Sequence, residues 1–216
     1  MPELTSIAVD EYRPLKGVGR VAQVSIVVSL VMNILGSILN VAGVELSVSE
    51  LKNLGALLNI LGNLCVILAL PITLLAMGFL IVWLRRGIRN LHTLNVSSAK
   101  ARDWQAFSFI IPVLNLFMPM LVMQEVWKAS DPNYLDDASW RSAPPSPVIM
   151  GYWVSLVVQI LLFLVSAFLP NEHLAMALEA FSLATSVLLV MIIGQLASRQ
   201  EAKRTLLLPA SRAQVD

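Results

Sequence analysis

The residues best suited to chemistry lie in the middle of the chain, where prolines interrupt an apolar stretch. Residues 107–127 read FSFIIPVLNLFMPMLVMQEVW and contain Pro112, Asn115 and Pro119, with Glu125 near their end. Each proline removes a backbone donor and obstructs the preceding turn, so one straight helix is not expected here. At membrane depth the freed backbone groups need a partner, and transporters place ligands at such breaks. These four residues form the candidate ligand or partner site, with purely structural roles as the alternative.

Basic and aromatic residues around this segment predict how it is held. Glu125 lies within plausible reach of Arg86 or Arg89, and such an ion pair would clamp the segment to the end of the preceding helix. Tryptophan rings favour the boundary between hydrocarbon and headgroups. The predicted interface anchors are Trp83, Trp104 and Trp127.

The other reactive side chains are isolated from one another. Cys65 lies within an apolar stretch, where a small packing residue is the expected role. His92 and His173 have no second ligand at helical spacing, so no metal site is predicted. We recognise no nucleophile–base pair. The sequence therefore predicts no cofactor, no metal and no enzymatic activity.

The composition is that of a membrane protein. Of the 216 residues, 57% are hydrophobic and 13% are charged, and the mean hydropathy is +0.75. A soluble domain carries about 25% charged residues. The net charge of +1 gives no reason to expect nucleic acid as a partner. The lipid bilayer is the expected surrounding, with a second copy or another membrane protein as possible partners.

Four apolar stretches are long enough to cross a bilayer, which takes roughly 20 residues. Their continuous rather than alternating apolar character predicts an all-α bundle. We expect a cytoplasmic N-terminal tail over 1–20, one transmembrane domain over 21–198 and a cytoplasmic C-terminal tail over 199–216. The predicted spans are 21–44, 60–84, 148–169 and 181–197.

Positive charge indicates how the broken segment 107–127 is placed. Lys and Arg collect in cytoplasmic loops. If this segment enters and leaves on the same face, all of the 15 Lys and Arg residues except Lys52 lie on one side. If it spans, they divide almost evenly. We therefore favour four spans, both termini in the cytoplasm and a re-entrant or interfacial segment, with five spans as the alternative.

Small residues recur every seven positions in the first two spans. A strict seven-residue repeat implies a left-handed crossing, and small residues let helices approach closely in lipid. We expect a tight antiparallel hairpin, which Gly36→Leu would destabilise. The two stripes are Ala22, Ser29, Gly36 and Gly43, and Gly55, Gly62, Ala69 and Ala76.

Polar residues in the spans lie toward the outer half. Asn33 and Asn40 in the first span face the level of Asn59 and Asn63 in the second, so amide hydrogen bonds between the helices are plausible. A polar lining for a small solute is the alternative. Glu179 begins the last apolar run, and we expect it at the outer interface rather than deep in the membrane.

The central segment carries a resemblance. Trp83, Arg86, Asn90 and Leu91 share one helical face, and the proline segment then leads into Met123, Glu125, Trp127, Ala129 and Ser130. This order resembles bacterial polytopic membrane proteins of the family called domain of unknown function 4328, over roughly residues 50–195. Met120 and Gln124 stand where that family often has an aromatic and a basic residue.

The resemblance implies a helical bundle in a bacterial inner membrane and no assigned activity. From the residues, we expect a non-enzymatic structural or interaction protein that acts through helix packing and cytoplasmic loops. The alternative is a small transporter or channel with the proline-broken segment at its solute pathway.

Overall fold

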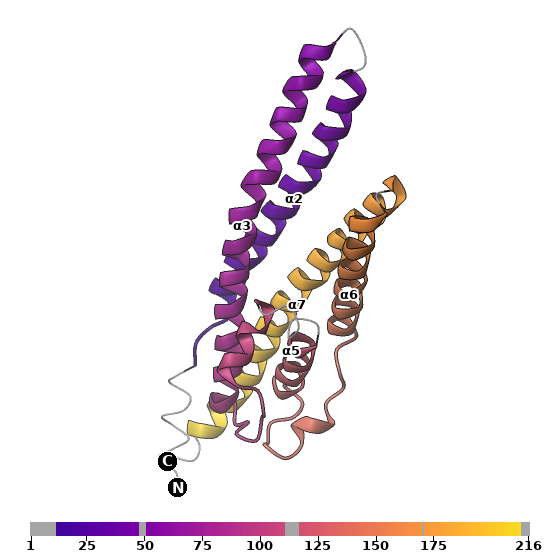
Figure 1. Cartoon of the computed structure of the whole chain (residues 1–216). Helices are drawn as coiled ribbons and strands as arrows, with labels where there is room; N and C mark the ends of the chain where they lie inside the picture. The colour runs from indigo at the N-terminus through magenta and orange to yellow at the C-terminus, as the bar shows by residue number, and fades with distance from the viewer. Residues whose placement is uncertain (1–11, 48–50, 111–116, 170, 213–216) are drawn as a thin grey trace.

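The computed structural model describes residues 12–47, 51–110, 117–169 and 171–212, and its regular elements are all helices (Figure 1). This confirms the predicted all-α class. The elements are α2 (Lys16–Ser47), α3 (Lys52–Thr93), η1 (Asp103–Phe109), α5 (Met118–Ala129), η2 (Trp140–Ser142), α6 (Pro147–Phe168) and α7 (Glu172–Arg212).

Four of these helices, α2, α3, α6 and α7, are long and apolar enough to cross a membrane. They contain the predicted spans 21–44, 60–84 and 181–197 in full, and the predicted span 148–169 except for Leu169. Helices α2 and α3 form one antiparallel hairpin, and α6 and α7 form a second (Figure 1). The exposed side chains along them are mostly large and apolar, as lipid-facing surfaces require.

The first hairpin is held together along the predicted small-residue stripes. In α2 the buried residues are those of the stripe together with Gly19. A methyl group added at Gly36 would lie 2.8 Å from Val66 Cγ2 and 2.9 Å from the Gly62 carbonyl oxygen. One added at Gly55 would lie 2.7 Å from the Gly43 carbonyl oxygen. The backbones touch where side chains are absent, which confirms the predicted close approach.

The second hairpin extends beyond its predicted boundaries. Ser146 caps α6 by accepting a hydrogen bond from the Ile149 amide at 3.3 Å. Helix α7 continues to Arg212, so the predicted tail over 199–216 is helical through most of its length. Gln200 and Lys203 are buried against other elements, which gives the extra turns a tertiary anchor. The cytoplasmic location of residues 199–216 stays a prediction. At the other terminus, helix α2 already begins at Lys16.

The broken segment does not form a fifth spanning helix in the described part of the chain. It consists of the end of η1 and the short helix α5, with residues 111–116 between them outside the described residues. These flanks pack against each other, and Gln105 Nε2 lies 3.8 Å from Met118 Sδ. Both flanks of the segment therefore lie at the same end of the bundle.

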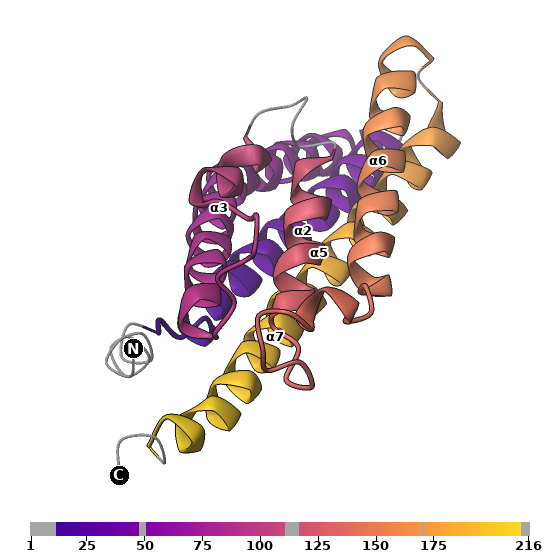
Figure 2. The ribbon, with the colours of Figure 1, turned by 90° about the horizontal axis from the view of Figure 1, so that it is seen from below.

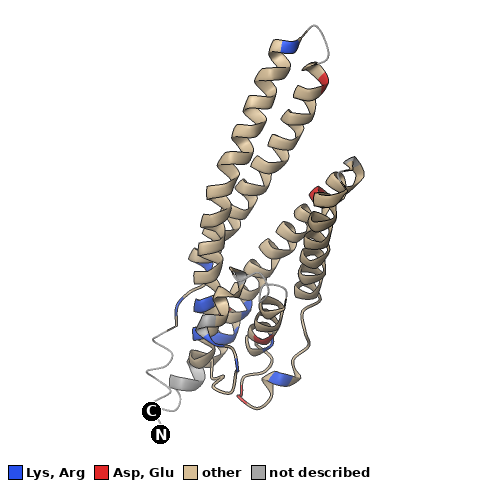
Figure 3. Cartoon of the chain, viewed as in Figure 1, with Lys and Arg blue, Asp and Glu red and all other residues tan. Residues whose placement is uncertain are grey.

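Helix α5 completes a packed core at the end of the molecule where α2 begins. Figure 2 shows α5 between α3 and α6. The core buries Trp83 and Leu84 of α3, Met123 of α5, and Ile192 and Leu196 of α7. Tyr12 and Arg204 meet here, with the guanidinium 4.6 Å from the ring centre. Most Lys and Arg residues lie at this same end (Figure 3).

Candidate functional site

The structure places part of the predicted site in the packed end of the bundle. Pro112 and Asn115 lie outside the described residues. Pro119 is buried in the first turn of α5, where a missing amide donor costs nothing. Glu125 accepts a hydrogen bond from the backbone amide of Lys100. Glu125 therefore holds the segment after α3.

The predicted clamp and anchors have different outcomes. The ion pair of Glu125 with Arg86 or Arg89 stays a prediction. Trp83 is 0% exposed and packs beside Gly19, so it belongs to the protein core rather than to a headgroup-facing belt. Trp127 is partly buried beneath the Arg199 guanidinium, which lies 4.0 Å from a ring centre. The side chain of Trp104 lies outside the described part.

A buried amide network joins three helices at this end. Gln200 Nε2 donates to the Gly87 carbonyl at 2.9 Å and to Ser130 Oγ at 3.1 Å. Asn90 Nδ2 donates to Gln200 Oε1 at 2.9 Å and also to the Arg13 carbonyl at 2.9 Å. Every amide group here has a partner, as a buried polar network requires.

Charged residues of α7 fasten the loop after α5. Lys203 is fully buried, and its Nζ donates to the carbonyls of Ala129 at 2.9 Å and Tyr134 at 2.7 Å. Arg199 pairs with Asp131 at 2.5 Å. Gln124 of α5 adds a reciprocal pair with Ser146, in which both hydrogen bonds measure 2.8 Å. These contacts make this end a rigid structural unit.

A second loop contact lies on the surface of this unit. Asp137 accepts hydrogen bonds from the Ser98 amide at 2.9 Å and the Ser97 hydroxyl at 2.7 Å. The Ser98 amide above all, with the Ser97 hydroxyl, lowers the pKa of this exposed carboxyl. The contact joins the segment after α3 to the loop before η2, which is again a structural role.

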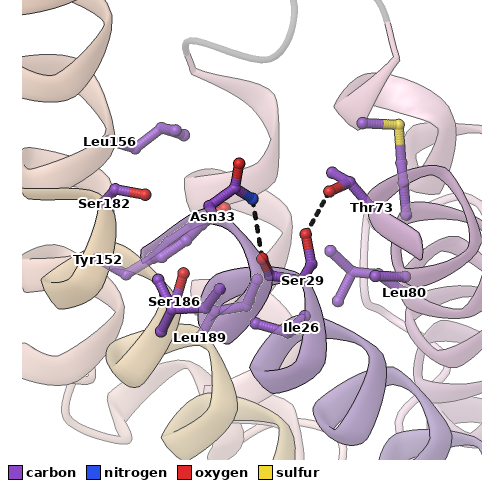
Figure 4. Close-up of a pocket in the computed structure, with 13 residues that line it drawn as sticks. Ile26, Ser29, Asn33, Thr73, Leu80, Tyr152, Leu156, Ser182, Ser186 and Leu189 are labelled. Carbon is purple, nitrogen blue, oxygen red and sulfur yellow. Dashed lines mark hydrogen bonds between the residues drawn. The ribbon is translucent and has the colours of Figure 1, made fainter. Parts of the chain in front are cut away.

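The candidate ligand site lies elsewhere, in a cavity between the two hairpins (Figure 4). It encloses about 310 Å³ and has walls from all four spanning helices. Its apolar wall includes Ile26, Leu30, Leu80, Leu156 and Leu189. Its polar wall consists of Ser29 and Asn33 of α2, Thr73 of α3, Tyr152 of α6, and Ser182 and Ser186 of α7.

The polar groups on the α2 and α3 side already have protein partners. Ser29 Oγ lies 2.5 Å from Thr73 Oγ1, and Thr73 also donates to the Ala69 carbonyl at 2.9 Å. Asn33 Nδ2 donates to the Ser29 carbonyl at 2.8 Å, which leaves its side-chain oxygen as an acceptor (Figure 4).

The polar side chains on the α6 and α7 side of the cavity have no such hydrogen-bond partners in the described part of the protein. Tyr152 is 4% exposed and lines the cavity, and its hydroxyl has no hydrogen-bond partner among the described residues. Ser182 and Ser186, on one face of α7, also line the cavity without a side-chain hydrogen bond in the described part. These three hydroxyls therefore line the cavity and can bind a polar group that enters it.

An adjoining cavity of about 370 Å³ continues this space toward the α6–α7 turn. The two share Asn33, Leu156 and Ser182 in their walls. The second cavity adds Gln159 and Glu179 to the polar lining, and its apolar wall includes Phe163. Together the two cavities form what we call the inter-hairpin crevice.

The depth of the crevice follows from helix geometry. Glu179 and Arg199 of α7 are about 30 Å apart along the helix, which equals the thickness of the hydrocarbon core. The crevice runs along α7 from Glu179 to Leu189, a helical distance of about 15 Å. Beyond Leu189, the core around Trp83 and Ile192 closes it toward the chain termini.

Sequence reasoning found this site only in part. It singled out Asn33 either for a hydrogen bond between helices or as a polar lining; Asn33 lines the cavity, and its amide donates within α2 to the Ser29 carbonyl. The predicted place of Glu179 at the outer interface stays a prediction. Tyr152, Ser182 and Ser186 were missed. The available signal was the spacing of Glu179, Ser182 and Ser186 on one helical face.

Comparisons with known proteins give a family but no activity. No group of three or more His, Cys, Asp and Glu residues in the described part is placed to hold a metal ion. No curated protein and no solved structure matches the chain significantly. A family model described as "Domain of unknown function (DUF4328)" matches residues 54–199. Because this match covers more than half of the chain, the protein, with its four membrane-capable helices, belongs to the DUF4328 family.

Proposed function

We propose that this protein is a non-enzymatic binding protein of the bacterial cytoplasmic membrane, and that the inter-hairpin crevice holds a small amphipathic ligand. The observation that carries the proposal is the position of Tyr152, a side chain only 4% exposed that lines the crevice and whose hydroxyl has no hydrogen-bond partner among the described residues. Hydrocarbon offers no hydrogen bonds, so an unpaired hydroxyl there is costly.

The shape and chemistry of the crevice suit such a ligand. Its inner cavity, at about 310 Å³, is at the lower end of the range for small-molecule sites. Mostly apolar walls with a few convergent polar groups are typical of such sites. The hydroxyls of Tyr152, Ser182 and Ser186 would bind the polar part of the ligand, and Leu156 and Leu189 its apolar part.

The closed inner end favours binding over transport. A solute that entered the crevice would meet the core formed by Trp83, Leu84, Ile192 and Leu196. Passage through it would require these packed side chains to separate. A pathway at the proline-broken segment, the alternative that the sequence suggested, lies on the far side of that core. We therefore expect saturable binding without solute flux in reconstituted vesicles.

The placement in the membrane is part of the proposal. Most Lys and Arg residues lie at the end of the molecule where α2 begins and α5 packs (Figure 3). Because such residues collect on the cytoplasmic side, the termini and the unit around α5 would face the cytoplasm, and the crevice would open outward. The cytoplasmic loops would then be available to a second copy or to another membrane protein.

The test uses the full chain in nanodiscs of zwitterionic lipid, with phenylbutanol as the probe. Calorimetric titration against empty nanodiscs should show saturable binding. Tyr152→Phe should weaken it about three- to tenfold, the effect of one lost hydrogen bond. Ser186→Leu should abolish it by filling the cavity. Tyr134→Phe is the matched control, since Tyr134 lies in the loop after α5, and should bind as the wild type does.

Two outcomes would overturn the proposed function. One is the absence of saturable binding by phenylbutanol and by its amine and carboxylate analogues. The other is binding that both Tyr152→Phe and Ser186→Leu leave unchanged, which would place the probe elsewhere on the protein or in the lipid.

A further inference from the structure

The charged lining of the inter-hairpin crevice is acidic only. Among the residues that line its two cavities, Glu179 is the one charged side chain, and no Lys, Arg or His lines either of them. Figure 3 shows a single acidic position near the outer end of α7 and no basic residue along the described outer half of α6 and α7. The crevice therefore presents a negative charge without a matching positive one.

The position of Glu179 makes this charge available to a ligand. Ser37 of α2 donates a hydrogen bond to one carboxylate oxygen at 2.6 Å. A carboxylate accepts about four hydrogen bonds, so most of its capacity is left. In the described part of the chain, Arg199 pairs with Asp131 and Arg204 pairs with Glu201. Neither ion pair involves Glu179.

The face of α7 continues the polar lining inward from this carboxylate. Ser182 and Ser186 follow Glu179 at three and seven residues, which places all three on one side of the helix. Asn33 and Gln159 add side-chain acceptors to the walls near the carboxylate. Apolar side chains, among them Leu156, Ile160 and Phe163, cover the space between the polar groups.

We infer that the ligand of the crevice carries an ammonium group, which binds at Glu179, and an apolar body that reaches inward toward Tyr152. This inference rests on the proposed binding function and adds the charge of the ligand to it. A primary ammonium has three donors, which suits Glu179 together with the acceptors of Asn33 and Gln159. The apolar walls and the volume favour an organic cation over a bare metal ion, because a metal ion would leave them without a partner.

Charge pairing at this depth is strengthened by its surroundings. A carboxylate at the edge of the hydrocarbon is less well solvated than one in water, and a bound cation neutralises it. Hydrogen bonds in which both groups are charged are shorter and stronger than neutral ones. An amine should therefore bind more tightly than an alcohol of the same shape.

The experiment compares three probes with one carbon skeleton: phenylbutylamine, phenylbutanol and phenylbutyrate. Each is titrated into the full chain in nanodiscs of zwitterionic lipid at neutral pH, with empty nanodiscs subtracted. We expect the amine to bind at least about tenfold more tightly than the alcohol, and the carboxylate most weakly. Tenfold corresponds to about 1.4 kcal/mol.

Two variants locate the preference. Glu179→Gln keeps the shape of the side chain and removes its charge, so the amine and the alcohol should then bind equally. Alcohol binding itself should change little. Glu45→Gln is the matched control: Glu45 is an exposed acid at the outer end of α2 that lines neither cavity, and this variant should keep the full preference.

The outcomes separate this inference from the proposed function. Equal binding of amine and alcohol by the wild type overturns the inference and leaves the binding function standing. A preference for the amine that persists in Glu179→Gln also overturns the inference and leaves the binding function standing. Stabilisation by sodium chloride alone, lost in Glu179→Gln, would assign the acid to an inorganic cation and also overturn it. Saturable binding by none of the three probes overturns the proposed function itself.

Discussion

Lys203 is a charged side chain without solvent exposure, and main-chain carbonyls hold its ammonium group. Its Nζ reaches the carbonyls of Ala129 and Tyr134, at the end of α5 and in the loop that follows. A buried charge is costly unless hydrogen bonds replace its water. The side chain therefore fixes the loop after α5 against α7, and its removal would take the donor from the buried Ala129 carbonyl and the partly buried Tyr134 carbonyl.

Lys203→Met should accordingly destabilise the protein by about 1–3 kcal/mol, the cost of leaving a buried polar group unpaired. Thermal unfolding in mild detergent measures this. Lys128→Met is the control, because Lys128 Nζ makes one exposed contact of 3.5 Å with the Arg141 carbonyl. Its effect should stay within about 0.5 kcal/mol. Equal melting temperatures of the two variants would contradict the role assigned to Lys203.

At the residue scale, the sequence indicated which side chains are unusual for a spanning helix better than it indicated what surrounds each side chain. Asn33 and Glu179 are conspicuous because polar groups are rare in apolar helices. Tyr152, Ser182 and Ser186 are not, since single hydroxyls occur in many spanning helices. Trp83 was predicted as an interface anchor from its position near a span end. Whether such a ring meets headgroups or a core depends on what covers it, and that is decided by segments far away in sequence.

At the scale of elements, the α2–α3 hairpin depends on backbone contact. Gly36 lies against Gly62 and Val66, and Gly43 lies against Gly55. In lipid no hydrophobic effect drives the helices together, so this close packing is the source of their association. Asn40 and Asn63 add one hydrogen bond between the helices at 3.3 Å.

Gly36→Leu should separate the helices and destabilise the protein by about 1–3 kcal/mol or more, as overpacking does. Gly78→Leu makes the same change on α3 at a position with open space around it, and it should be tolerated. Thermal unfolding of both variants in the same detergent gives the comparison. If Gly36→Leu and the wild type had the same melting temperature, the helices would be held together by something other than this contact.

The hairpin was predictable from sequence because a seven-residue repeat is a local pattern that reports directly on a helix face. The arrangement around α5 was not. Gln124 pairs with Ser146 and Glu125 with the amide of Lys100, and neither partner follows from spacing. The extra turns of α7 likewise depend on Gln200 and Lys203 meeting α3 and the loop after α5.

At the scale of the whole molecule, the four spans return the chain to the side on which it began. Tyr12 and Arg204 meet at one end, and η1 and α5 pack at that same end. The loop between α5 and α6 should therefore share a side with both termini. This arrangement followed from the distribution of Lys and Arg, a property of the whole chain that no single segment displays.

Site-directed labelling tests on which side of the membrane the loop between α5 and α6 lies. In a Cys65→Ala background, Ala138→Cys places a thiol on an exposed position of that loop. A membrane-impermeant maleimide should leave it unlabelled in intact cells and label it after permeabilisation. Leu51→Cys, at the exposed tip between α2 and α3, is the control and should react in intact cells. Labelling of Ala138→Cys in intact cells would contradict the proposed orientation.

The length of α3 has a consequence for the membrane around the protein. No charged residue lies between Lys52 and Arg85, a helical distance of about 50 Å, while α6 has 22 residues and spans about 33 Å. A bilayer with a hydrocarbon core of about 30 Å fits α6 but is too thin for an upright α3. Hydrophobic mismatch of this kind is relieved by tilt. Because only one hairpin has to tilt, bilayer thickness would set the angle between the hairpins, and lipids with shorter acyl chains would widen the mouth of the crevice.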